Sequence, residues 1–156
     1  TPEPVPTTIP AIESSSKTFN INNIKAGDKI GTFQVKNIGP FEPKYSELSE
    51  KNFKITFSGK ILVTGDYTIT DGTEIGIGTK YVTFVPNEVS ASLLPIEEHT
   101  GQFGYSKSFV FNNYDQAVEL LISKGKSGQA TVVIDDYTLV SYPSEVNNTA
   151  ELIQVN

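Results

Sequence analysis

Two groups of acidic residues are the first places in this chain where chemistry could occur. Glu97 and Glu98 directly precede His99, which is the only histidine. Carboxylate oxygens are the ligands that hard divalent cations prefer, so this triplet is a candidate cation site. A solvated acidic loop explains the same residues, and no EF-hand-type spacing surrounds them. We therefore expect a loop here and no metal ligand.

The second group is the adjacent pair Asp135 and Asp136. Glycoside hydrolysis needs two carboxyl groups that converge across a cleft. Neighbouring side chains of a regular strand point to opposite faces, so this pair converges only if the strand bulges. We expect these two residues to form a bulge on a solvent-facing strand. The sequence therefore predicts no catalytic residue and no enzyme; a hydrolase that works with carboxylates alone ranks last.

Composition excludes several further classes of function. The chain has 156 residues, no cysteine, twelve lysines and no arginine, with a net charge of -6. Without cysteine there is no disulfide framework, thiolate metal site or cysteine nucleophile. The missing arginine and the negative charge argue against a nucleic-acid partner. No apolar run approaches the length that spans a bilayer, so we expect no membrane insertion by this segment. We also expect no cofactor.

The elements that would carry any site are mainly strands. From Phe53 to Ile69 the odd positions are apolar or glycine and the even positions are polar, except Leu62. This alternation predicts a β ribbon with one buried face. Seventeen residues would span about 56 Å, whereas a compact domain of this size has a radius of gyration of about 15 Å. The ribbon is therefore either one long strand bent at Gly65, which we favour, or a hairpin with its loop at 58–60.

The remaining pattern predicts further strands and one helix. Asn113 is expected to be the N-cap of a helix over 114–124, with Gln116 at the capping-box position. The spacing of Gly72, Gly76 and Gly78 indicates a hairpin connection and not a phosphate-binding loop. A parity switch after Asp135–Asp136 indicates the bulge. Loops are expected at 39–51, with one helical turn near its end, and at 86–107; further strands are expected at 18–24, 32–38, 81–85, 109–111, 130–139 and 150–155.

These elements predict a mainly β fold, either an OB-like barrel or a β-sandwich of about seven to nine strands with one short α-helix. Residues 17–156 are expected to form a single β domain. Residues 1–16 form a Pro/Thr/Ser-rich arm, with four prolines in its first ten residues. Such an arm is either a spacer or, through Val5, Ile9 and Ile12, an extended segment that docks on a neighbouring subunit by strand addition.

Four aromatic residues fall in predicted loops and are candidate ligand contacts: Phe41, Tyr45, Phe103 and Tyr105. Asn147 begins a formal glycosylation sequon, which matters only in a secreted protein.

The order of elements resembles an OB-fold. The segments FNNYDQAVELL, GQATVVIDDYTLVSYPSEV and NTAELIQV are also similar to an OB-fold-like domain, itself uncharacterised, of secreted or membrane-anchored bacterial surface proteins. The similarity covers roughly residues 25–155. It implies a surface-exposed, tethered domain and carries no known activity or site residues.

Together these features favour a non-enzymatic extracellular structural module. We expect a filament or pilus-type subunit that assembles through its N-terminal arm, with another copy of itself or another cell-surface protein as partner. The alternative is a membrane-anchored surface domain that binds a small glycan or peptide through an OB-like face. Low charge, many Thr, Ser and Asn residues, and the absence of Cys and Met favour an extracellular or cell-surface location.

Overall fold

The computed structural model of the chain describes residues 17–44, 47–73, 78–99, 107–142 and 147–156. The strands within these ranges are β1 (Thr18–Phe19), β2 (Lys29–Ile30), β3 (Phe33–Gly39), β4 (Phe53–Ser58), β5 (Ile61–Asp71), β6 (Lys80–Pro86), β7 (Ile96–Glu97), β8 (Phe109–Phe111), β9 (Ser127–Ser141) and β10 (Asn148–Val155). The helices are α1 (Glu88–Ala91) and α2 (Tyr114–Ile122).

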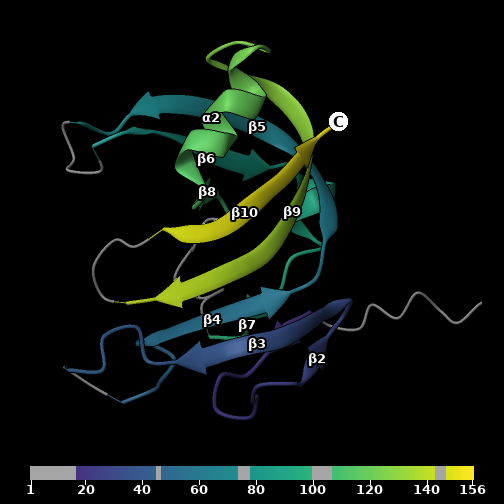
Figure 1. Ribbon diagram of the computed structural model, residues 1–156. Helices are drawn as coiled ribbons and strands as arrows, with labels where there is room; N and C mark the ends of the chain where they lie inside the picture. The colour runs from purple at the N-terminus through teal and green to yellow at the C-terminus, as the bar shows by residue number, and fades with distance from the viewer. Residues whose placement is uncertain (1–16, 45–46, 74–77, 100–106, 143–146) are drawn as a thin grey trace, which may run out of the picture.

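Five strands close into a small barrel. β6 pairs with β5 and β8, β8 pairs in parallel with β10, and β9 pairs with both β10 and β5, which completes the ring. α2 lies between the third and fourth barrel strands in chain order, and it contacts β6 and β10 (Figure 1). This arrangement confirms the predicted mainly β, OB-like fold.

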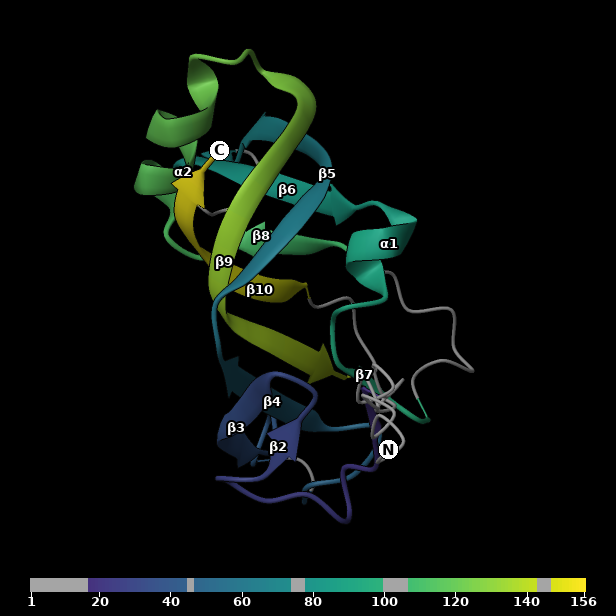
Figure 2. The ribbon, with the colours of Figure 1, turned by 90° about the vertical axis from the view of Figure 1, so that its right-hand side faces the viewer.

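The other strands extend the sheet beyond the barrel. β4 pairs with the second half of β9, β3 pairs with β4, and β2 forms the edge. We call residues 25–60, which include these three strands, the extension, and residues 61–156 the barrel region. β9 runs through both parts, so the barrel and the extension lie toward its two ends (Figure 2). β1 and β7 form a separate parallel pair.

The predicted ribbon is interrupted at Gly59 and Lys60. β4 and β5 do not pair with each other; both are antiparallel to β9, one after the other. The hairpin alternative is therefore wrong. The chain continues in one direction along β9, as a single bent strand would, but it is divided into the two strands β4 and β5. Gly59 has a φ of +141°, a conformation that side chains with a Cβ rarely adopt.

Gly65 is not the point at which the ribbon breaks. It lies within β5, where the backbone of β6 approaches closely: a Cβ at this position would be 2.2 Å from the carbonyl oxygen of Val85. The residue must be glycine because two strands nearly touch there. The predicted bend at Gly65 is thus replaced by a close backbone approach.

The interruption faces the predicted bulge. Asp136 has a φ of +50°, and the register with β9 shifts between the β4 and β5 segments. The Asp135 carboxylate accepts hydrogen bonds from the backbone N–H groups of Gly59, at 3.1 Å, and Asp136, at 2.8 Å. Lys36 of β3 forms an ion pair with Asp136 at 3.1 Å. The bulge prediction is confirmed, and the two aspartates join the extension to the barrel.

The alternation along the ribbon is also confirmed. Phe53, Ile55, Phe57, Val63 and Tyr67 are buried. The exception, Leu62, lies on the polar face with half of its surface exposed.

The core holds two groups of aromatic rings. Phe84, Phe109 and Phe111 contact one another in the barrel, with ring centroids 5.4 to 5.7 Å apart. In the extension, Phe57 contacts Phe19 at 5.5 Å and Phe33 at 6.1 Å. The barrel interior is therefore filled by side chains.

Several local predictions are corrected. The strand expected at 18–24 ends after Phe19, because the Asn20 side chain accepts from the backbone N–H of Asn22 and starts a turn. Residues 47–51 form an isolated bridge and turns and no helix. Residues 86–107, expected to be irregular, contain the short helix α1. The side chain of its N-cap, Asn87, accepts a hydrogen bond from the Ser90 N–H.

α2 begins after Asn113 as predicted, but the expected cap hydrogen bond is absent. Instead, the Asn113 amide exchanges two hydrogen bonds with the backbone of Leu152 in β10, at 2.8 and 2.9 Å. Its amide nitrogen also donates to Gln116. Asn113 thus ties the helix start to the barrel, because the side-chain amide mimics a strand partner.

Candidate functional site

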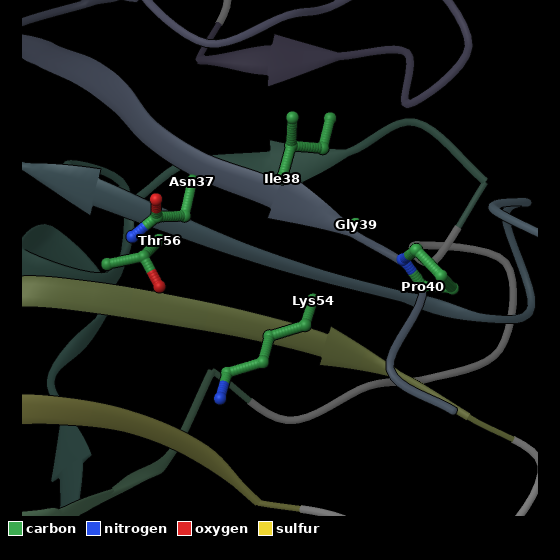
Figure 3. A pocket seen from close by; sticks show the side chains of 6 residues that line it. All are labelled: Asn37, Ile38, Gly39, Pro40, Lys54 and Thr56. Carbon is green, nitrogen blue, oxygen red and sulfur yellow. The ribbon is translucent and has the colours of Figure 1, made fainter. Parts of the chain in front are cut away.

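An open groove lies on the outer face of the extension. Its volume is about 310 Å³, and its lining residues come from the end of β3, the loop after it, and β4: Asn37, Ile38, Gly39, Pro40, Lys54 and Thr56. Asn37, Thr56 and Lys54 carry polar groups on the same side of the two strands, whereas Ile38 points to the other side (Figure 3). The site is built by β-strand periodicity, since Lys54 and Thr56 are on the polar face of β4.

The groove adjoins an unpaired strand edge. β2 pairs only with Phe33 and Gln34, and the backbone of Val35 bonds to Gly27 and Asp28. Beyond Val35, no strand among the described residues pairs with the outer edge of β3. A register shift between Val35 and Asn37 marks a bulge at Lys36, so the available edge is short. Unpaired backbone groups of this kind accept an extended chain.

The polar groups of the groove have few protein partners. The Thr56 hydroxyl bonds to Thr138 across the sheet at 2.9 Å. Lys54 makes none of the ion pairs found among the described residues, whereas the nearby Lys36 is paired with Asp136. The groove therefore offers an exposed cation beside hydrogen-bonding groups, which suits an acidic or polar ligand.

The Glu97–His99 group is a structural latch in the described part of the chain. The Glu97 side chain is fully buried, and its carboxylate accepts from the Ile21 N–H at 3.3 Å and from the N–H and Nδ1 of His99, both at 2.7 Å. The Glu98 carboxylate accepts from Asn20 at 2.7 Å. Both acids thus hold the chain segment that follows the arm.

The electrostatics of this latch involve three acids. The hydrogen bond that the His99 ring donates to Glu97 raises the pKa of His99 above its usual range. Burial, the next largest cause, lowers this pKa, and the charges of Glu97, Glu98 and Glu50 raise it. No group of three or more side chains in the described residues is arranged to hold a metal ion. The expected solvated acidic loop is wrong at Glu97, because this residue lies in β7 and its side chain is buried.

Two lysines donate to carbonyl groups at the end of α1, and one of them, Lys17, belongs to the segment that follows the arm. Lys17 donates to the carbonyl of Ser92, and Lys107 donates to that of Ala91 at 2.8 Å, at the end of α1. Burial, followed by the nearby charge of Lys17, lowers the pKa of Lys107. Phe19 and Ile21 are buried beneath these contacts. The point where the arm joins the domain is therefore firmly anchored.

The predicted site residues are only partly placed. Phe41 packs against Tyr142 with ring centroids 5.3 Å apart, and it follows Pro40 of the groove. Tyr45, Phe103 and Tyr105 lie outside the described residues, as do Val5, Ile9 and Ile12 of the arm. Asn147 is exposed, as a glycosylation acceptor must be.

Sequence reasoning missed the groove. Lys54 and Thr56 appeared only as members of a polar face, and Asn37 as part of a strand. The shortness of β2, which leaves the edge open, has no local signature in the sequence.

Neither helix of the described residues has the length and apolar character that a bilayer crossing needs. Comparison of the chain with family models, curated proteins and solved structures found no match.

Proposed function

We propose that this protein is a non-enzymatic extracellular structural module whose copies associate head to tail, with the N-terminal arm of one copy contacting the next. The observation that carries the proposal is the opposite charge of two regions at opposite ends of β9. Such a contact is heterologous, so it continues into an open assembly unless the rotation closes it.

The charge difference is large for a small domain. The extension holds seven lysines and four acids, whereas the barrel region holds four lysines and twelve acids. Two of those acids, Glu97 and Glu98, lie beside β1; without them the barrel region still holds ten. The basic extension attracts acidic parts of another copy, which include the arm with Glu3 and Glu13, and this favours a heterologous contact.

The anchor of the arm supports the same proposal. Buried side chains at Phe19 and Ile21, the pairing of β1 with β7, and the buried Glu97 carboxylate fix the segment from which the arm emerges. A contact made by the arm would therefore transmit force to the domain. An arm that served only as a loose spacer would not need this attachment.

The barrel offers little for chemistry in its described residues. Aromatic side chains fill it, and the only histidine hydrogen-bonds to Glu97. This supports a role in contact over one in catalysis.

Sedimentation velocity of the full chain tests the proposal. We expect concentration-dependent association at about 0.01 M salt that weakens toward about 1 M salt, because screening shortens the range of charge attraction. A monomer under all of these conditions, or association that strengthens with salt, would overturn the proposed mode of assembly.

The arm is tested in the full-length chain. The triple variant Val5→Asp, Ile9→Asp, Ile12→Asp should lose association while the domain stays folded by circular dichroism. The matched control Thr1→Asp, Thr7→Asp, Thr8→Asp adds the same charge and spares the apolar residues. Equal association of the two variants would show that the apolar arm residues are not used.

A further inference from the structure

The groove and the open edge of β3 point to a docking surface, and we propose that its occupant is the arm of a second copy. The inference rests on the proposed function and adds the surface on which the arm docks. The segment that pairs with the edge is Thr7–Ile9, which lies between Pro6 and Pro10.

The backbone chemistry of the arm allows that segment to pair with a strand edge. Proline has no N–H group and does not donate to a strand ladder. Thr7, Thr8 and Ile9 are three consecutive residues with N–H groups in the proline-rich part of the arm. The free edge from Lys36 to Gly39 is about 13 Å long at roughly 3.3 Å per residue, so a segment of this size matches it.

The length of the arm allows the contact. Seven residues, 10–16, separate Ile9 from Lys17, where the described chain begins. Fully extended they span up to about 23 Å, which exceeds the radius of gyration of about 15 Å expected for the domain. An extended arm is therefore long enough to contact a neighbouring copy.

Charge and polarity agree with this occupant. The arm contains Glu3 and Glu13 and no basic residue. The groove presents Lys54, which has no ion-pair partner among the described residues, and the extension around it is basic. An ion pair at the rim adds specificity and orientation more than affinity.

Cysteine cross-linking tests the contact directly, because the natural chain has no cysteine. One pool carries Ile9→Cys and a second, of distinguishable mass, carries Asn37→Cys. After mixing and mild oxidation, we expect a disulfide-linked heterodimer. The matched control replaces the second pool by Val85→Cys, an exposed position on β6 of the barrel. Equal heterodimer yields with Asn37→Cys and Val85→Cys would overturn the proposal.

Two further measurements separate the alternatives. A chain carrying both Ile9→Cys and Asn37→Cys that forms mainly an intrachain disulfide at high dilution would show that the arm binds its own groove, and this also overturns the proposal. Lys54→Glu should reduce the heterodimer yield several-fold, whereas Lys126→Glu, the same change at an exposed barrel position, should not.

Sedimentation of the same samples keeps the two proposals distinct. Association that persists without the Ile9–Asn37 cross-link would retain the proposed function and reject this acceptor. Cross-linking above the control, together with association that Lys54→Glu weakens, would support both.

Discussion

The barrel and the extension share β9, but in the described part of the chain the barrel has no free strand edge whereas the extension has one. In the barrel every strand has two neighbours, and the ring closes through β9 and β10. In the extension the sheet ends at a two-residue strand, and beyond Val35 the outer edge of β3 has no strand partner among the described residues. Closure removes edges, whereas an open edge is a template for another chain. One long strand, β9, therefore supports both a closed barrel and an open sheet edge.

The largest expected effect tests how tightly the barrel is closed. Gly65→Ala places a Cβ against the Val85 carbonyl, so the β6 backbone must move, and we expect a loss of about 3 kcal/mol in the free energy of unfolding. Gly39→Ala in the extension meets nothing within 4 Å and should change it by no more than about 0.5 kcal/mol. Urea denaturation of both variants measures the contrast. Equal losses would mean that the two regions are equally close-packed.

The next effect tests the joint between the regions. Asp135→Ala removes the acceptor of the Gly59 and Asp136 N–H groups, and we expect it to destabilise the protein by about 1.5 kcal/mol. Lys36→Gln removes only an exposed ion pair and should cost about 0.5 kcal/mol. The same denaturation series compares them. If Asp135→Ala costs no more than Lys36→Gln, the bulge does not couple the extension to the barrel.

A smaller effect, of opposite sign, is expected at the interface of the two cores. Tyr137 is buried between Phe57 of β4, its strand partner, and the ring of Phe109, and its hydroxyl has no hydrogen-bond partner in the described residues. Burial also raises the pKa of Tyr137. Tyr137→Phe should therefore stabilise the protein by about 1 kcal/mol, because an unsatisfied polar group leaves the interior.

The matched control for this change is Tyr67→Phe in the barrel. The Tyr67 hydroxyl donates to the Gly125 carbonyl at 2.9 Å, so its removal should destabilise the protein by about 1 kcal/mol. Thermal unfolding should show a higher midpoint temperature for Tyr137→Phe and a lower one for Tyr67→Phe, relative to the wild type. A shift to lower temperature for both would indicate that the Tyr137 hydroxyl contributes favourably.

The smallest effect concerns the latch beside the extension. The pKa of His99 is raised in the folded protein, chiefly by Glu97, so protonated His99 contributes stability that is complete below its unfolded value of about 6.5. This contribution disappears as the pH rises through the folded pKa. Glu97, Glu98 and Glu50 are the charged groups that face the ring. The imidazole is one-third exposed, so screening keeps the effect small.

We expect the wild-type free energy of unfolding to decrease above pH of about 6.5, relative to His99→Gln, which lacks the titrating group. Denaturant titrations across this pH range give the difference between the two curves. A constant difference would show that the latch depends on the hydrogen bond of neutral His99 and not on its charge.

Much of the fold could be predicted from local pattern. The alternation at Phe53, Ile55 and Phe57 correctly assigned the buried face of β4, because strand periodicity is a property of adjacent residues. The parity change at Asp135 and Asp136 located the bulge for the same reason. The start of α2 at Tyr114 was also correct. The groove could not be predicted, because it depends on which strands become neighbours and where β2 stops.

The sequence by itself determined the strand faces, the bulge, the helix start, the net charge and the absence of cysteine and arginine chemistry. Only the tertiary structure decided that Asn113 pairs with Leu152 instead of capping its helix, that the ribbon breaks at Gly59, and that β3 keeps an open edge. The physical reason is the distance along the chain over which each feature is determined. Side-chain alternation is local, whereas strand neighbours, partners of buried polar groups and free edges depend on contacts between residues far apart in the chain.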